Sequence, residues 1–378
     1  MIAPRLAAAL ALGLTALNGP APPPLFASGN AERAPGPSRD RPIRAQPGAV
    51  HAPGTAKLPP IAIPPPPAPP AERERGVALG LFAEDVSFSY GSLLAEIVAL
   101  GATHVALVVP LYQTDGASTE LALDTRFSPT LDVVAETARA AKRDGLEVTI
   151  FPIVRLSAPR AGEWRGTLAP RDRDAWFRSY ADRLGDLAGI AAMTGAKRLV
   201  VGSELSTLDG DLAHWSPLID QVRAVFGGKL VYSANWDHYR NAALFDLVDE
   251  EGISGYFNLR DAKAPDDDAT AEAGWRRVRQ ELEAWRAGRS SPFVFTELGY
   301  RSRAGATAAP WDETAGGTPD PDEQRRGFAA FRRAWAGSDL LAGVYIWNWY
   351  GYGGPATIGY TPRGKPAEAE VRALLEAL

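Results

Sequence analysis

The chain has 378 residues, 46% hydrophobic content and a formal net charge of −5 at pH 7, which is typical of a globular protein with one large domain or two small ones. The mildly acidic balance gives no basic surface for phosphates, so we expect no nucleic-acid partner. The absence of cysteine excludes disulfides, thiolate nucleophiles and thiolate metal sites. The histidines form no metal-binding pair of the HExxH kind, so we predict neither a metal nor another cofactor; they are His51, His104, His214 and His238.

Residues 1–28 have the features of a secretory signal peptide. Arg5 precedes an apolar stretch of about a dozen residues, and small residues and prolines follow. The stretch is shorter than the roughly 20 residues of a membrane-spanning helix, so we expect an exported protein, secreted or periplasmic, with no membrane span in the mature chain. Cleavage near Gly19 and cleavage near Ser28 fit equally well, and an uncleaved anchor or a misassigned start codon are the alternatives.

Residues 29–75 are rich in proline, alanine and arginine and include the run "LPPIAIPPPPAPP" (58–70). Such a segment cannot bury a core and favours extended polyproline II, so it predicts a disordered, semi-rigid spacer. A ligand for a proline-recognising module is the alternative, which export disfavours. The folded domain is then expected at residues 76–378.

Short apolar segments alternate with longer amphipathic ones through the folded part. The apolar segments, read as strands, are 77–82, 104–112, 146–154, 198–205, 229–236, 252–259, 293–300 and 341–350. The segments with helical spacing that follow them are 93–101, 131–145, 174–195, 212–228, 241–248, 271–288, 322–337 and 367–378.

These segments make eight strand-then-helix units, the number in a (β/α)8 barrel. The strands are continuously apolar rather than alternating, which indicates a parallel sheet buried on both faces. A doubly wound open sheet is the competing fold, and it usually has a glycine-rich phosphate loop after its first strand. The corresponding stretch "GLFAED" (80–85) lacks that motif, so the barrel is favoured.

Two of the predicted strands end in glutamate. Glu204 ends "VVGSEL" and Glu297 lies in "FVFTELGY". Barrel enzymes assemble their active sites at the carboxyl ends of the strands, and two carboxyl groups there suit glycoside hydrolysis, in which one donates a proton and the other attacks or activates water. A single glutamate at a strand end is more often only solvated or ion-paired, so the hypothesis depends on the pair.

The other strand ends carry aromatic, amide or hydroxyl groups, which suit sugar binding because aromatic faces pack on the C–H faces of sugars. These residues are Tyr112, Asn235, Trp236, Tyr256, Asn258, Trp347 and Trp349. The i, i+2 spacing of Trp347 and Trp349 predicts that both lie on one side of a strand. Packing in the barrel core is the alternative role for these two tryptophans.

The chain also resembles glycoside hydrolase family 113, the β-mannanase-like members of the clan A retaining hydrolases. The matching stretches occur in order over nearly the whole domain: "GEWRGTLAP" (162–170), "WFRSYADRL" (176–184), "VVGSELSTL" (200–208), "YSANWD" (232–237), "FTELGYRS" (295–302), "PWDET" (310–314) and "GYTPRGKPAEAEV" (359–371). As a set they are specific, although only "FTELGY" and "GYTPRGKPA" are strong individually.

The resemblance implies a retaining hydrolysis of a β-linked polysaccharide or oligosaccharide, most simply β-1,4-mannan. It implies that Glu204 is the general acid/base, that Glu297 is the nucleophile and that Tyr256 steadies the nucleophile. The residues that we expect to bind substrate are Trp164, Arg165, Asn235, Trp236, Trp311, Trp347 and Trp349, and ordinary loop anchoring is the alternative for Trp164 and Trp311. We expect a monomer.

The sequence departs from the family's pattern at two points. Ser203 replaces the threonine that many relatives have before the acid/base glutamate, and it keeps the hydroxyl. Relatives often have a histidine near the end of the third strand, where "FPIVRL" places Ile153, with Arg155 as a possible substitute. This difference leaves open a substrate other than β-1,4-mannan.

Other functions have weaker support. The same barrel without catalysis would give a carbohydrate-binding protein of the cell envelope, because a fold alone does not prove activity. The glycines of 351–360 suggest a phosphate-binding barrel only weakly. The acidic loop 261–269 lacks the spacing of a calcium loop, and Lys365 is expected either to cap the last helix or to position the loop before it.

Overall fold

The computed structural model describes residues 73–378 except 86, 290–292 and 336. The predicted signal peptide, residues 1–28, and most of the predicted spacer lie outside the described residues. Within the described part, no helix combines the length and the hydrophobicity needed to cross a bilayer.

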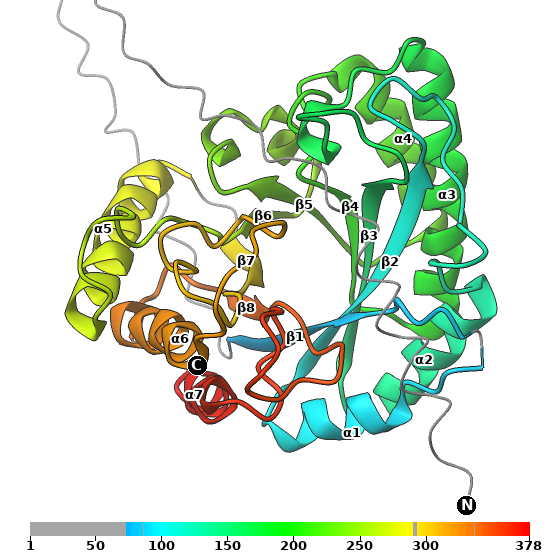
Figure 1. Ribbon diagram of the computed structural model, residues 1–378. Coiled ribbons are helices and arrows are strands. Elements are labelled where there is room, and N and C mark those ends of the chain that lie inside the picture. The colour runs from blue at the N-terminus through cyan, green and yellow to red at the C-terminus, as the bar shows by residue number, and fades with distance from the viewer. Residues whose placement is uncertain (1–72, 86, 290–292, 336) are drawn as a thin grey trace, which may run out of the picture. The chain divides into compact units, whose positions relative to one another are not determined.

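Eight parallel strands pair in chain order and close into a barrel, with β1 beside β8 (Figure 1). The strands are β1 Glu74–Gly80, β2 His104–Gln113, β3 Glu147–Leu156, β4 Arg198–Ser203, β5 Lys229–Asn235, β6 Glu250–Ser254, β7 Phe293–Leu298 and β8 Gly343–Ile346. All eight predicted strands are present, and the predicted (β/α)8 barrel is confirmed.

Helices surround the barrel (Figure 1). They are α1 Gly91–Ala99, α2 Leu131–Arg143, α3 Arg173–Thr194, α4 Leu212–Val225, α5 Asp268–Arg286, α6 Pro321–Trp335 and α7 Pro366–Glu376, with short 3₁₀ helices η1 Arg165–Thr167, η2 Tyr239–Asn241 and η3 Ala243–Leu247. The predicted helix 241–248 is therefore wrong in type. The chain forms η2 and η3 there instead, and β6 begins at Glu250, shortly after η3 ends.

Several helices begin or end at residues that satisfy their free backbone groups. The Thr130 side chain accepts a hydrogen bond from the backbone N–H of Val133 at the start of α2, and Asp172 does the same for Ala175 at the start of α3. Gly195 ends α3 in the left-handed conformation, with φ of 65°, which glycine adopts at little cost. Local sequence thus sets these helix boundaries.

The barrel separates two apolar layers. A large cluster fills the space between the strands and the helices, while a smaller one fills the lumen with the inward side chains of alternate strand residues. The inward residues include Ala106, Val108, Phe151 and Val200. Because the lumen is packed, only its two ends are available for polar chemistry.

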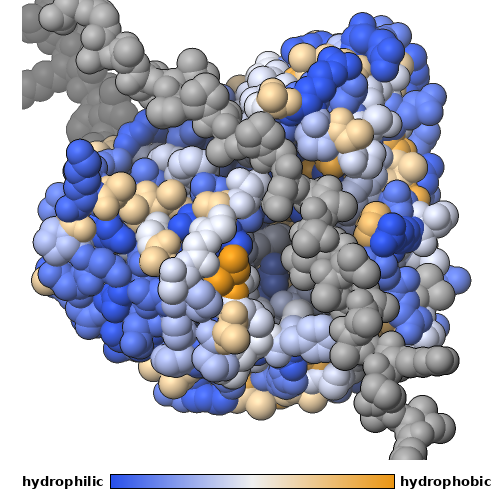
Figure 2. All heavy atoms as spheres, viewed as in Figure 1, coloured by the Kyte–Doolittle hydropathy of each residue, from blue (hydrophilic) through white to orange (hydrophobic). Residues whose placement is uncertain are grey.

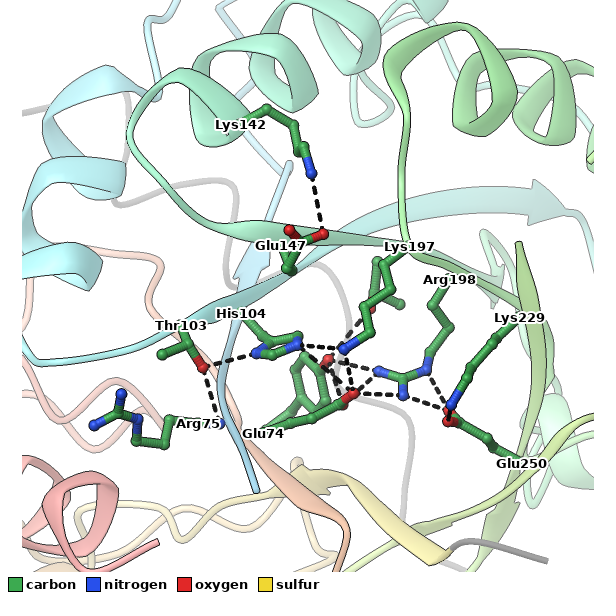
Figure 3. Close-up of polar contacts among 12 residues, drawn as sticks. Glu74, Arg75, Thr103, His104, Lys142, Glu147, Lys197, Arg198, Lys229 and Glu250 are labelled. Carbon is green, nitrogen blue, oxygen red and sulfur yellow. Dashed lines mark hydrogen bonds and ion pairs between the residues drawn. The ribbon is translucent and has the colours of Figure 1, made fainter. Parts of the chain in front are cut away.

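A buried ion network closes the amino-terminal end of the barrel (Figure 3). Arg198, only 1% exposed, donates to Glu74 Oε2 at 2.6 Å and to Glu250 Oε2 at 2.6 Å. Lys197 and Lys229 add further contacts, to Glu74 Oε1 at 3.1 Å and to Glu250 Oε1 at 2.5 Å. Burial alone would raise the pKa of Glu74, but the charge and hydrogen bond of Arg198, with smaller effects of His104 and Lys197, together outweigh it and lower the pKa to about 2.

Glu74 also corrects the predicted domain boundary. The strand β1 begins at Glu74, whereas the composition placed residues 74 and 75 in the spacer and the domain start at Gly76. Charged residues are typical of linkers, but here the barrel buries a charged side chain by giving it Arg198 as a partner.

Two strands, β6 and β8, end well before their predicted last residues. The strand β6 ends at Ser254, so Tyr256 and Asn258 lie in the loop that follows. The strand β8 ends at Ile346, so Trp347 and Trp349 lie beyond it. An apolar run in the sequence shows where the chain is buried. The strand itself ends where the backbone hydrogen bonds to the neighbouring strand end.

Candidate active site

The backbone at the end of β4 turns Glu204 toward the mouth of the barrel. The pairing of β4 with β5 shifts register between Val200 and Gly202, which resets the alternation of side chains. Glu204 follows with φ of 55°, an uncommon conformation for a residue with a Cβ that is seen most often at functional sites. Its N–H donates to the Ser233 carbonyl at 2.7 Å, and the residue is only 3% exposed.

A similar irregularity in β7 positions Glu297. Strict alternation would place Thr296 and Glu297 on opposite faces of the strand. The register shifts, however, against both neighbouring strands, and Glu297 rather than Thr296 pairs with Ser254 of β6. Thr296 therefore contacts Ser233 Oγ at 2.6 Å, while Glu297 also faces the interior at 1% exposure.

The contacts of Glu297 suit a carboxylate held in a fixed orientation. The Tyr256 hydroxyl donates to Oε2 at 2.8 Å, and the Ser203 hydroxyl donates to Oε1 at 3.4 Å. Burial and the nearby Glu204 charge raise the pKa of Glu297; Arg165, Tyr256 and Ser203 act in the opposite direction but do not cancel that rise. Burial and Glu297 also raise the pKa of Tyr256, so its phenol stays protonated and can donate.

Glu204 has different partners. The Ser254 hydroxyl donates to its Oε1 at 2.5 Å, and Arg165 Nη2 lies 2.5 Å from its Oε2. Burial lowers the pKa of Arg165, but the charges of Glu204, Glu297 and Glu313 more than compensate and raise it. Because the Arg165 guanidinium is affected by both Glu204 and Glu297, the two carboxyl groups belong to one site.

The loop between β3 and α3 holds Arg165 in this position. Arg165 is the first residue of η1, and the half-buried Trp164 ring lies so close to Gly166 that a Cβ there would be 2.3 Å from it. Glycine is thus required for the ring to cover the backbone. The predicted substrate-binding Arg165 is in the site, but its side chain contacts Glu204 rather than open space.

Several of the predicted aromatic and amide residues lie at the same end of the barrel as the two carboxyl groups. Trp347 is 8% exposed and belongs to the lumen cluster, with Trp236 packed against it. Asn235 accepts from Ser254, which also contacts Glu204. Trp311 is farther out, 41% exposed, and donates to Asn258 Oδ1 at 3.0 Å. A hollow near the centre of the molecule in Figure 2, beside the loops after β7 and β8, marks this end of the barrel.

The prediction that Trp349 binds substrate is wrong. Trp349 is 2% exposed, packs in the outer cluster between barrel and helices, and donates from Nε1 to Glu96 of α1 at 2.8 Å. The i, i+2 rule failed because the strand ends before Trp347, and beyond a strand the alternation of faces no longer holds.

Ser254, which contacts Glu204, was missed by sequence reasoning. The available signal was its position in the predicted strand 252–259, in the middle of the stretch "GISGYFNL". The strand ends at Ser254 rather than at Leu259, so a serine lies at the mouth of the barrel. With the correct strand boundary, the expectation that active-site residues lie at strand ends would have selected Ser254.

The remaining motifs have structural roles. In the acidic loop, Asp266 is neutralised by Arg326, and the neighbouring Glu323 pairs with Arg260. In the glycine-containing segment 351–360, the Gly359 carbonyl accepts from Lys365 at 3.2 Å, so Lys365 positions this loop. Carbonyl groups facing cations are the opposite of a phosphate-binding arrangement.

Comparison with known proteins agrees with this site. The family model described as Glycoside Hydrolase Family 113 matches residues 84–353, whereas no curated protein matches the sequence. A solved complex of a GH113 beta-1,4-mannanase has a TM-score of 0.72 at 24% identity, and the match covers 81% of this chain and 100% of that chain. The GH113 beta-mannanase AaManA from Alicyclobacillus acidocaldarius, solved with ManMIm, has a TM-score of 0.71 at 26% identity, covering 81% and 97%.

More distant relatives share only the fold. A beta-glucuronidase from Faecalibacterium prausnitzii has a TM-score of 0.56 at 15% identity, with 81% of this chain and 49% of that chain covered. The family model, by contrast, spans most of the chain, from the loop after β1 to the loop after β8. The chain therefore belongs to glycoside hydrolase family 113 and is a glycoside hydrolase.

Proposed function

We propose that the enzyme hydrolyses β-1,4-mannan-type chains with retention of configuration, using Glu297 as nucleophile and Glu204 as general acid/base. The observation that carries this proposal is the pair of buried carboxyl groups in one site, each with its own hydroxyl donor. The substrate class is supported by the beta-mannanases among the similar structures.

In the first step, Glu297 attacks the anomeric carbon, the bond from that carbon to the leaving oxygen breaks, and Glu204 gives its proton to that oxygen. The Tyr256 hydrogen bond holds the attacking carboxylate in one orientation. In the second step, Glu204 takes a proton from water, the water oxygen attacks the same carbon, and the ester to Glu297 breaks.

Arg165 and the two glutamates interact within the site. Arg165 Nη2 lies 2.5 Å from Glu204 Oε2, and burial together with the Glu204 charge raises the pKa of Glu297. Glycosylation needs a proton on Glu204 and a negative charge on Glu297. The leaving-group oxygen of a bound sugar chain must therefore reach the Glu204 carboxyl group beside Arg165.

The test is to follow the products of β-1,4-mannohexaose by proton NMR during the first minutes of reaction. Retention predicts that the new reducing ends are first β and only later reach the equilibrium of anomers by mutarotation. Initial α anomers would show inversion. If no new reducing ends form but the oligosaccharide binds measurably, the proposed hydrolysis is wrong and the alternative of a carbohydrate-binding protein is supported.

Replacing Arg165 is expected to change the pH dependence of kcat/KM. Arg165 lowers the pKa of Glu297, so its loss in Arg165→Met raises that pKa. A carboxyl group with a higher pKa needs a higher pH to ionise, and Glu297 must be ionised to attack. The acidic limb of the profile should therefore move to higher pH.

The matched control for this experiment is Arg165→Lys, which keeps the positive charge and should leave the limb closer to that of the unmodified enzyme. The position of the limb is independent of any general loss of activity. If both variants have the acidic limb of the unmodified enzyme, Arg165 does not act on the nucleophile.

A further inference from the structure

Arg155 occupies the part of the mouth formed by β1, β2 and β3, away from the two glutamates. Thr149, Phe151 and Ile153 of β3 face the lumen. The pairing of β2 with β3 continues without a register shift up to Leu156, so the alternation holds and Arg155 faces inward above Ile153. It forms the last inward layer of this strand.

Aromatic rings frame the Arg155 side chain. Its guanidinium carbon lies 5.9 Å from the centre of the Phe82 ring, within the range of cation–π attraction, and Phe82 in turn packs edge-on against Tyr350 with centroids 5.4 Å apart. Tyr112 is the register partner of Arg155. Burial raises the pKa of Tyr112, and the Arg155 charge opposes this rise, so the two side chains are close.

Arg155 has no charged partner among the residues that the structure describes. Two acidic groups whose charges act on the surrounding tyrosines Tyr350 and Tyr112 are engaged elsewhere: Glu84 pairs with Arg126 at 3.3 Å, and Asp124 accepts backbone N–H groups of its own turn. Arg155 is nevertheless half-buried. A half-buried cation without a counter-charge is costly, and it contrasts with Arg165, which has Glu204.

We infer that Arg155, with Phe82 and Tyr112, forms a subsite for a sugar that carries a carboxylate, so that the preferred β-linked chain carries acidic units. The planar guanidinium matches a carboxylate with two parallel hydrogen bonds, and the rings offer apolar faces to the sugar. Because Glu204 and Glu297 follow β4 and lie in β7, the acidic unit lies beside the cleaved bond, not at it. This inference rests on the proposed function.

The test compares partially C6-oxidised β-1,4-mannan oligosaccharides with the same material after its carboxyl groups have been reduced. The unmodified enzyme should cleave the acidic material with a kcat/KM roughly tenfold to hundredfold higher, the gain expected of a charge-assisted bidentate contact. The preference should weaken at high salt. Arg155→Gln should lose most of this preference. Arg155→Lys should lose less of it, because lysine keeps the positive charge although it cannot form the two parallel hydrogen bonds.

Arg126→Gln is the matched control, because Arg126 is an exposed arginine of the loop after β2 that pairs with Glu84. It should keep the preference. Equal kcat/KM on both materials, with Arg155→Gln unchanged on each, would overturn the acidic subsite and leave the proposed hydrolysis intact.

Cleavage of neither material would overturn the proposed function instead. Calorimetric titration of the Glu297→Gln variant with both materials then decides the subsite separately. If Glu297→Gln binds the acidic material more tightly, and the double variant with Arg155→Gln does not, the acidic subsite is supported. Equal binding of the two materials by Glu297→Gln refutes the subsite.

Discussion

The Glu297→Gln variant is expected to lose about 10⁴-fold or more of kcat on β-mannan oligosaccharides, because an amide cannot attack the anomeric carbon as a carboxylate does. The fold should survive, since glutamine has the same shape and can still accept from Tyr256. Steady-state kinetics and a thermal melt measure the two effects. Glu136→Gln, an exposed change on α2, is the matched control and should keep normal kcat.

The roles of the two glutamates can be separated with azide and an aryl β-glycoside. In Glu297→Ala, azide should attack the anomeric carbon directly, expel the phenolate and give the α-glycosyl azide. In Glu204→Ala, azide should open the ester to Glu297 and give the β-glycosyl azide. The reverse pattern would exchange the roles of the two glutamates. The test is needed because Arg165 forms an ion pair with Glu204, the proposed acid/base.

The Arg198→Ala variant is expected to lose about 3–5 kcal/mol of unfolding free energy, because it leaves the buried Glu74 and Glu250 carboxylates without their main partner. Urea unfolding measures the loss. Activity per folded molecule should change little, since this network closes the end of the barrel opposite the site. Arg126→Ala, which breaks an exposed ion pair, should cost at most about 1 kcal/mol. A similar small cost for Arg198→Ala would show that the network contributes no more than a surface pair.

The sequence alone determined the barrel and the identity of the two carboxyl groups. Buried parallel strands are short, continuous and apolar, so eight of them could be counted, and the helices between them begin and end at local capping residues such as Thr130 and Gly195. Because barrel chemistry is confined to the carboxyl ends of the strands, Glu204 and Glu297 could be selected from position alone.

Only the tertiary structure decided which way these side chains face. The register shifts in β4 and β7 depend on the neighbouring strands. In β7 the shift lets both Thr296 and Glu297 face the interior, whereas simple alternation would place them on opposite faces of the strand. The same dependence removed Trp349 from the site, brought Arg165 onto Glu204 and made Glu74 part of the barrel. Each of these outcomes rests on contacts between residues far apart in the chain, which no local pattern of side chains encodes.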